Sequence, residues 1–481
     1  MSAPNCLRCL LQLRPSVAVP RYVASRSTAA ASAIPIASAW TAPFSTTTAR
    51  DAKKKDKSGG GTHIRAGKKI KLGKFKKNTT ADRGKAPAPG ERKAYRKKIL
   101  LSNNNALPVP GLADLSAEDM LNPKNAATVL SIPDAVVDQL RASEAFKPTQ
   151  CWGVFRKPSV LLRSETIDLM TRMKGAAKQK QTLRLVVTGD RITGKSMLLL
   201  QAMTHAFLND WIVVNIPEGQ ELTTACTEYA AIPGSDPVRY MQQNYVLKLI
   251  QAIRKANEKV FSKLSTVHSH PELPQHIPVG SPLMQLANSA KEADNAWMIF
   301  QALWQELTAR GRPPLLFALD GLAHVMKVSD YRSPAFELIH SHDLALVRLF
   351  VESLSGAGAF PNGGAILAAT SRGNSPRTPT MELALAQREA EQAKDAAADV
   401  PQPDPFFRGY DERVQAALRT VQVLKLSGIT KLEARVLMEY WAASGILRTT
   451  VDETAVSEKW TLGGNGVVGE MERAALLTMR L

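Results

Sequence analysis

Four short apolar runs, rich in Val, Leu and Ile, punctuate the middle of the chain. They span residues 183–188, 211–217, 314–320 and 363–371. Short runs of this kind predict buried strands. Apolar spacing typical of helices follows the first run at 196–210, and longer amphipathic stretches at 238–261 and 282–310 separate the second run from the third. Strands that alternate with helices predict an α/β fold with a parallel sheet covered on both faces.

The segments on either side of these runs predict further units. Short helical patterns predict a helical N-terminal extension over residues 101–182. The core is expected over 183–380, with a helical insertion at 218–313. A charged, Ala-rich helix and a Pro-rich stretch predict a linker over 381–408, and amphipathic helices around a Gly-rich turn predict a small helical C-terminal subdomain over 409–481.

The formal charge of +19 over 481 residues comes from the first hundred residues. Residues 1–50 hold five Arg and no acid, and are rich in Ser, Thr and Ala, which predicts a mitochondrial transit peptide. The alternative is a disordered cytosolic tail. A secretory signal fits less well, because Arg and Pro interrupt every apolar run.

Residues 51–100 hold eighteen Lys or Arg against four acids and few large apolar side chains. Such a segment cannot bury enough surface to fold alone, so we expect a disordered basic arm. Cations of this density favour contact with RNA phosphates, and Phe75 or Tyr95 can stack on an exposed base. The alternative is a solvated linker.

Several classes of protein are disfavoured. No unbroken apolar stretch reaches the roughly 18 residues that span a bilayer, so we expect a soluble mature chain. Cys6 and Cys9 fall in the predicted leader, which leaves only Cys151 and Cys226 and argues against a disulfide framework or a zinc site. A loop with three histidines (268, 270 and 276) lacks a carboxylate or Cys at metal-ligand spacing, and we expect a surface loop there.

The turn after the first predicted strand matches the phosphate-binding pattern G-x-x-x-x-G-K-[ST] in full. In such a loop the glycines let backbone N–H groups surround phosphates, the lysine reaches the β- and γ-phosphates, and the hydroxyl ligates Mg²⁺. The helix that follows adds its positive N-terminus. The predicted nucleotide-binding residues are Gly189, Asp190, Arg191, Ile192, Thr193, Gly194, Lys195 and Ser196.

The third apolar run ends at Asp320, where a carboxylate can hold Mg²⁺ together with Ser196. The alternative is that the Asp-Gly pair simply forms a turn. Thr370 and Ser371 end the fourth run, and they can either bond a γ-phosphate or a lytic water or cap the next element.

Hydrolysis needs a residue that activates water, and many P-loop ATPases carry a Glu directly after the metal-binding Asp. Gly321 stands there in this chain, and nothing aims His324 or Asp330 at the site. The sequence therefore favours a slow or silent NTPase. The guanine-reading pattern N-K-x-D is absent, so the residues do not distinguish guanine from adenine.

The order of these features resembles the death-associated protein 3 family, in its fungal branch. The similarity rests on the basic start, "TGDRITGKS", "LLFALDG", "GGAI" and "LEARVLMEYWAASGIL", and covers the chain from about residue 145 onward. It implies an α/β, P-loop NTPase-type parallel sheet like that of AAA and signalling ATPases. It also implies a protein of the mitochondrial small ribosomal subunit in the matrix, which contacts ribosomal RNA and neighbouring ribosomal proteins.

The resemblance further implies a bound GTP or GDP with Mg²⁺, and ATP is the alternative nucleotide. The turn at 463–465 and Arg473 loosely resemble the phosphate-sensing C-terminal element of related ATPases. The nucleotide is then expected to stabilise the fold. Two rivals stay open: an active NTPase that serves as an assembly factor or chaperone, and a nucleotide-dependent signalling switch.

Overall fold

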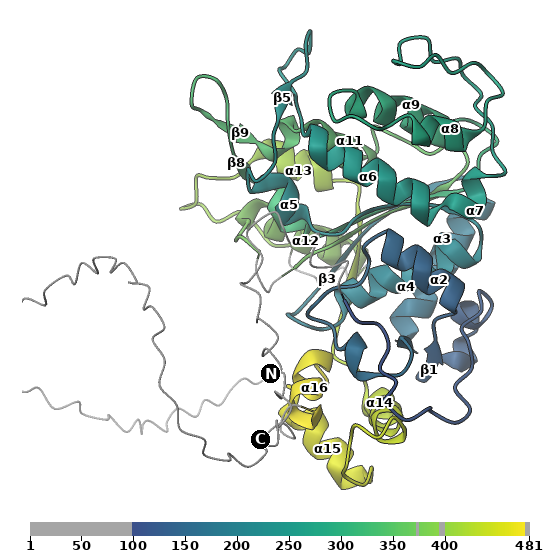
Figure 1. Ribbon diagram of the computed structural model, residues 1–481. Helices are drawn as coiled ribbons and strands as arrows, with labels where there is room; N and C mark the ends of the chain where they lie inside the picture. The colour runs from purple at the N-terminus through teal and green to yellow at the C-terminus, as the bar shows by residue number, and fades with distance from the viewer. Residues whose placement is uncertain (1–98, 372–374, 394–399, 477–481) are drawn as a thin grey trace, which may run out of the picture. The chain divides into compact units, whose positions relative to one another are not determined.

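The computed structural model describes residues 99–371, 375–393 and 400–476. The predicted leader and nearly all of the basic arm lie outside the described residues. The centre is a five-stranded parallel sheet in the order β11-β3-β10-β7-β4 (Figure 1). Its strands are β3 (Thr182–Gly189), β4 (Ile212–Ile216), β7 (Leu315–Asp320), β10 (Gly364–Ala369) and β11 (Gln422–Leu426).

Helices make up most of the remaining described structure. They are α2 (Asp134–Ala142), α3 (Ser164–Lys178), α4 (Lys195–Leu208), α5 (Gly219–Thr223), α6 (Gln243–Ala256), α7 (Glu258–Phe261), α8 (Leu283–Asn288), α9 (Ala296–Thr308), α10 (Leu322–Val325), α11 (Ala345–Ser355), α12 (Pro379–Gln392), α13 (Glu412–Leu418), α14 (Lys431–Ala443), α15 (Glu453–Leu462) and α16 (Val468–Leu476).

Short elements complete the description. The antiparallel pairs are β1 (Thr128–Ser131) with β2 (Ser159–Leu162), β5 (Ala230–Ala231) with β6 (Tyr240–Met241), and β8 (Val328–Arg332) with β9 (Leu338–His340). The 3-10 helices are η1 (Asp119–Leu121), η2 (Pro123–Asn125), η3 (Trp152–Val154) and η4 (Ser341–Asp343).

The α/β prediction and its four strands are confirmed, and the sheet is parallel as expected. A fifth strand, β11, lies inside the segment 409–481 that we expected to be helical, so that expectation is wrong there. β11 pairs with β3 at an edge of the sheet, and its residues range from exposed to buried. A half-exposed edge strand lacks the continuous apolar run by which buried parallel strands are recognised.

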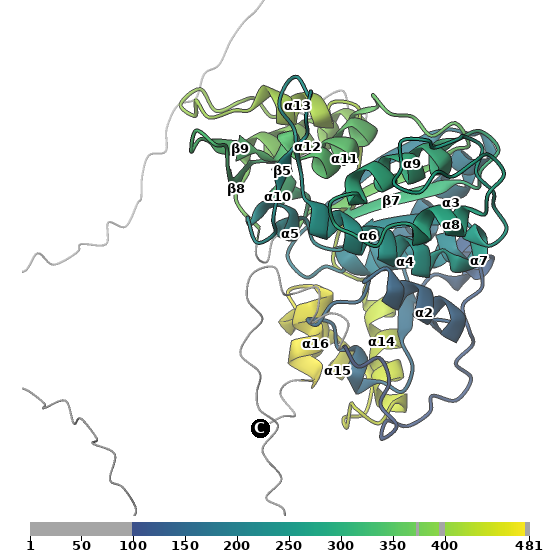
Figure 2. The same ribbon diagram turned by 45° about the horizontal axis from the view of Figure 1, so that its top comes forward.

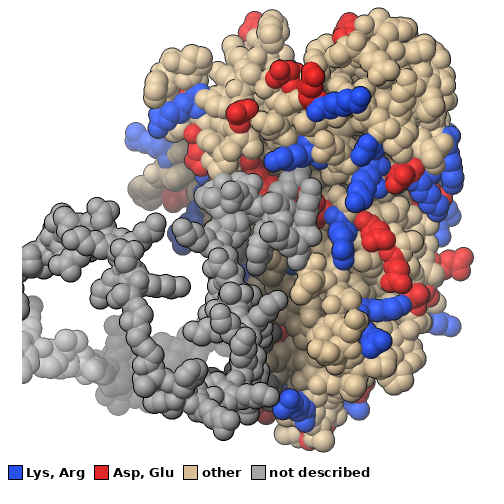
Figure 3. All heavy atoms as spheres, in the orientation of Figure 1, with Lys and Arg blue, Asp and Glu red and all other residues tan. Residues whose placement is uncertain are grey.

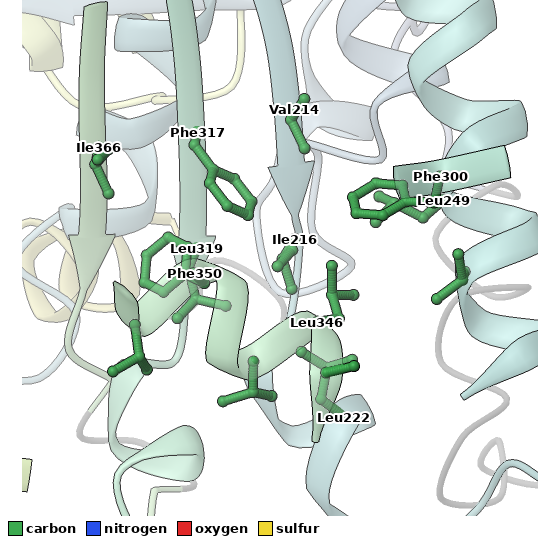
Figure 4. Packing of buried hydrophobic residues seen from close by; sticks show 14 of the residues in the cluster. Val214, Ile216, Leu222, Leu249, Phe300, Phe317, Leu319, Leu346, Phe350 and Ile366 are labelled. Atoms are coloured by element: carbon green, nitrogen blue, oxygen red, sulfur yellow. The ribbon is translucent and has the colours of Figure 1, made fainter. Parts of the chain in front are cut away.

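Both faces of the sheet are covered by helices because successive strand residues point to opposite sides. Phe317 and Ile366 pack on one side with residues of α6, α9 and α11, as Figure 4 shows. Leu316 and Leu367 pack on the other side with residues of α2, α3 and α4. The phosphate-loop helix α4 therefore lies on the second face.

The insertion between β4 and β7 contains α5 to α9 and the β5–β6 pair, and the two long helices predicted there are broken. The first is interrupted at Asn257, which is fully buried and whose amide group bonds both the N–H and the C=O of Val213 at 2.8 Å. The second is interrupted between α8 and α9.

The N- and C-terminal segments share an apolar cluster. Trp441 and Met438 of α14 are buried with Val129 and Leu161 of the β1–β2 pair beside them. Phe155 stacks on Tyr440 with ring centroids 5.1 Å apart. The extension 101–182 is thus not purely helical, because β1 and β2 offer a flat apolar face to α14.

The segment 381–408, expected to be a linker, begins inside α12. Met381, Ala384 and Leu385 of this helix are buried in the core on the α11 side of the sheet. The many Ala and charged residues of this segment made the apolar side of the helix difficult to recognise in the sequence.

Candidate phosphate-binding site

The loop of residues 189–196 connects β3 to α4 at the carboxyl edge of the sheet. Gly194 is the N-cap of the 14-residue helix α4, and Lys195 is its first residue. The first backbone N–H groups of a helix have no partner within it, so they and the helix dipole favour an anion at this point. The expected strand, loop and helix therefore occur in the order that the motif requires.

Two glycines of the loop adopt backbone angles that other residues rarely take. Gly189 has φ +140°, and a Cβ on it would lie 2.3 Å from the carbonyl oxygen of Leu426 in β11. Gly194 has φ +103°. A side chain at Gly189 would separate the loop from the edge strand, so this glycine is required by packing as well as by conformation.

The middle of the phosphate loop is bonded to a residue of the C-terminal helix α16. Ile192 has φ +53°, and its carbonyl oxygen accepts a hydrogen bond of 3.1 Å from the N–H of Gly469 in α16. The hydroxyl of Thr193 bonds the carbonyl of Asp190 at 3.0 Å. The C-terminal helix α16 thus contacts the loop directly, where the sequence indicated only a loose resemblance to a sensing element. Arg473 itself is half exposed and pairs with Glu470 at 2.9 Å.

Lys195 is only 6% exposed and folds back over the loop. Its ammonium donates to the carbonyl oxygen of Gly189 at 3.0 Å and to that of Asp190. The charge is therefore held inside the concave side of the loop, at the N-terminus of α4. A charge in this position adds to the field of the helix rather than opposing it.

Asp320 ends β7 and is 5% exposed. Ala369 of β10 is paired in register with both Asp320 and Val187, so the carboxylate lies two strands from β3 and at the same height as the start of the loop. Its carboxylate forms an ion pair with Lys147, a residue that the sequence did not single out. Asp320 is more than a turn residue, because its charge is buried and matched.

Gly321 follows with φ +85°. Its carbonyl oxygen would lie 2.7 Å from a Cβ on Gly219 at the start of α5, so the two segments are in close contact. A Glu at position 321 would have to adopt a strained left-handed conformation. His324 is buried in α10, whereas Asp330 is exposed on β8.

The hydroxyl of Thr370 forms a hydrogen bond within the sheet. It donates to the carbonyl of Val187 at 3.3 Å, and the Thr370 N–H donates to the same oxygen at 3.0 Å. Thr370 therefore ties the end of β10 to β3. Ser371, by comparison, is partly exposed at the same edge.

Arg163 is a second residue that sequence reasoning missed. Its guanidinium donates to the carbonyl of Thr193 at 3.2 Å and to the carbonyl of Ser427 at 3.0 Å, and it pairs with Glu165 at 2.7 Å. One side chain thus joins the loop, the end of β11 and the start of α3. Its partner Ser427, directly after β11, is 264 positions away, so no local pattern indicates this role.

The histidine loop is largely exposed, as expected of a surface loop, but one of its three histidines is buried. His270 is buried, and its Nε2 lies 3.2 Å from the carboxylate of Glu306, as does Nδ1 of His268. Glu306 also accepts from Arg312 at 2.5 Å. Among the described residues no group of three or more His, Cys, Asp or Glu side chains is placed to hold a metal ion.

A family model described as mitochondrial ribosomal death-associated protein 3 matches residues 160–474. The chain belongs to this family. It is 58% identical over the whole length of both chains to the small ribosomal subunit protein mS29 of Neurospora crassa. It is also 24% identical to mS29 of Schizosaccharomyces pombe, over 68% of this chain and 67% of that one.

The family confirms the resemblance seen in the sequence and the expected mitochondrial location. In the part of the chain that the structure describes, no helix is long and apolar enough to cross a membrane. The nucleotide, the metal and the roles of residues 189–196 stay predictions.

Proposed function

We propose that this protein is a structural component of the mitochondrial small ribosomal subunit and holds a purine nucleotide in the loop of residues 189–196. The ribosomal part rests on the family and on the name of a relative that is 58% identical over the full length of both chains. The ligand is GTP or GDP by the resemblance of the chain to its family, with ATP as the alternative.

The observation that carries the nucleotide proposal is the buried lysine of the loop. Lys195 is held by loop carbonyls at the N-terminus of a 14-residue helix, where backbone N–H groups and the dipole already favour an anion. A polyphosphate entering the loop accepts from those N–H groups and from the Lys195 ammonium. The loop follows β3, an interior strand of the order β11-β3-β10-β7-β4. This arrangement fits a P-loop NTPase-type core.

Ser196 and Asp320 are the residues that would hold Mg²⁺. The metal would supply positive charge to the phosphates. The donor set fits, because a hydroxyl and a buried carboxylate are oxygen ligands of the kind that Mg²⁺ prefers. Lys147 supplies a positive charge to Asp320 in the structure, so it has to move away when a metal takes its place.

Slow turnover or none is the expected enzymology. Position 321 carries Gly in a left-handed conformation, tightly packed against the start of α5, so the usual carboxylate that activates water is missing there. The nucleotide acts as a ligand of the native state and raises stability by mass action. The basic arm, residues 51–100, extends this role as an RNA contact on the basis of its charge.

The test is the nucleotide content and turnover of the purified full-length chain. We expect about one purine nucleotide per chain after gel filtration, and comigration of the chain with the small subunit in mitochondrial lysate at moderate salt. Turnover of about 1 per second or faster would instead support the active NTPase. Absence of the chain from the small-subunit fraction would rule out the ribosomal role.

A further inference from the structure

Two loops present the most exposed large apolar side chains of the described residues. Phe406 is 92% exposed and Phe336 is 79% exposed. Phe336 lies in the hairpin between β8 and β9, and Phe406 lies in the stretch between α12 and α13. Exposed single apolar residues are common, but two phenylalanines displayed on neighbouring loops need an explanation.

The hairpin is firmly anchored. Tyr331 of β8 is buried, and its hydroxyl bonds the amide of Gln242 at 2.8 Å and the hydroxyl of Thr227 at 2.7 Å. The turn is closed by a 2.8 Å bond from the N–H of Ser333 to the carbonyl of Glu337. Phe336 is therefore carried by a rigid turn rather than by a loose one.

The second loop is ordered by its own side chains. The carboxylate of Asp404 accepts from the N–H of Phe406 at 2.9 Å, and the hydroxyl of Tyr410 accepts from the N–H of Asp404 at 2.9 Å. The ring of Phe407 packs edge-on against Tyr410 with centroids 4.8 Å apart. The backbone of both phenylalanines is thus held by hydrogen bonds, which reduces the backbone entropy lost on binding.

The bases of the two loops are joined. Nε2 of His340 lies 3.0 Å from the carboxylate of Asp411, and Arg413 lies 3.3 Å from that of Asp343. Figures 1 and 2 both show the two loops projecting on the same side. We call residues 328–340 and 400–411 together the two-loop surface.

A cavity of about 380 Å³ lies beside the hairpin turn. Tyr229, Tyr331 and Phe336 are among its lining residues, and the rings of Tyr229 and Tyr331 lie 4.6 Å apart. The surface thus offers two protruding aromatic rings and one aromatic recess. Interlocking of this kind is typical of the buried centre of protein–protein interfaces.

Charge distinguishes a protein partner from RNA. Surfaces that bind nucleic acid carry a strong excess of positive charge. The two-loop surface carries two basic residues, Arg332 and Arg408, against four acidic ones, Asp330, Glu337, Asp404 and Asp411. Figure 3 likewise shows Lys and Arg interleaved with Asp and Glu over the described part of the visible face.

We propose that the two-loop surface docks a neighbouring protein, which receives Phe336 and Phe406 in apolar pockets and places an apolar side chain in the cavity at Tyr229. The partner is a folded protein of mixed surface charge rather than RNA. This inference rests on the proposed function, since it takes the neighbour to be another protein of the small subunit.

Photo-crosslinking of the full-length chain in intact mitochondria tests the proposal. Three variants are compared: Phe336→p-benzoylphenylalanine, Phe406→p-benzoylphenylalanine and, as a control on another exposed apolar site, Leu462→p-benzoylphenylalanine, whose native side chain is 63% exposed. We expect positions 336 and 406 to form an RNase-resistant adduct with the same protein, and position 462 not to form it.

The double variant Phe336→Ala/Phe406→Ala then tests the energetics. Binding of the crosslinked protein to the purified full-length chain should weaken by roughly tenfold or more, because buried aromatic anchors dominate interface energies. The matched control is Leu432→Ala/Leu462→Ala, where two exposed leucines are removed from α14 and α15 without expected effect.

RNase-sensitive adducts, no adduct at either position, or a change in binding below about twofold would overturn the proposal. Fractionation of the irradiated mitochondria separates this outcome from failure of the ribosomal role. If the chain is missing from the small subunit, the proposed function fails, whereas a shared protein adduct at positions 336 and 406 still supports a docking surface.

Discussion

Two buried charged centres, the Glu306 cluster and the phosphate loop, differ in the kind of partner that surrounds them. Glu306 is fully buried and accepts from Arg312 at 2.5 Å, from the N–H of Val267 at 2.8 Å and from that of His268 at 2.7 Å. Burial would raise the pKa of Glu306, but these donors outweigh it and hold the pKa below its usual value.

In the phosphate loop the ammonium of Lys195 donates to the carbonyl oxygens of Gly189 and Asp190 at the N-terminus of α4, where the first backbone N–H groups have no partner within the helix. The Glu306 cluster is complete within the chain and holds the insertion together. The loop instead gathers positive charge and hydrogen-bond donors, which is the arrangement that favours an anionic ligand. The charge of Glu306 is therefore structural, whereas that of Lys195 lies where an anion is favoured.

The largest effect is expected when the charge of Glu306 is removed, which tests whether this carboxylate is purely structural. Glu306→Gln leaves the buried Arg312 without its counter-ion, and loss of one partner of a buried pair costs about 3–5 kcal/mol. Urea unfolding should show this loss with and without nucleotide. Glu292→Gln, at an exposed acid of the same insertion, is the control and should change stability little.

Lys195→Ala should reduce the stabilisation that the ligand adds, beyond any loss in the ligand-free chain from the bonds to Gly189 and Asp190. The variant should lose the bound purine nucleotide, and with it about 4 kcal/mol of stabilisation at a thousandfold excess of ligand over its dissociation constant. Thermal melting with and without added GTP measures this difference, with Lys178→Ala as an exposed control. An equal response of Lys195→Ala and the wild-type chain to GTP would show that the lysine does not hold the nucleotide.

Lys147→Met tests whether the carboxylate of Asp320 serves the fold alone or also holds a metal. The substitution leaves a buried carboxylate without its cation and should cost about 1–3 kcal/mol or somewhat more in the nucleotide-free chain. If Mg²⁺ binds at Asp320, Mg²⁺ with GTP should recover more stability in this variant than in wild type. The nearby exposed Lys157→Met is the control, and equal recovery in the two chains would argue against a metal at Asp320.

The smallest effect is expected from pH. Burial, with some contribution from His340, lowers the pKa of His342 to about 3. The unfolded chain binds a proton near the ordinary pKa of about 6.5, so stability is fully present above that pH and is lost as the pH falls from 6.5 towards 3.

Between pH 8 and pH 5 this group contributes a loss of up to about 2 kcal/mol. His342→Gln should remove that part of the pH dependence in urea unfolding, whereas His276→Gln, at an exposed histidine, should leave it in place. An unchanged pH profile in His342→Gln would mean that the imidazole titrates normally in the folded chain.

The sequence by itself determined the four buried strands, the order of strand, loop and helix around residues 189–196, and the family. Each of these depends on neighbours within a few positions, because the apolar period and the glycines of the loop are local properties. The positions of Gly189, Lys195 and Asp320 at the edge of the sheet follow from that local order.

The tertiary structure alone decided which residues complete these features. Lys147 meets Asp320 across 173 positions, and Arg163 meets Ser427 across 264. The edge strand β11 is recognised only by its pairing with β3, and the histidine loop only by its contact with Glu306. Such contacts depend on how distant segments pack. The partner of a single charged or half-exposed residue cannot be predicted from the residues next to it in the sequence.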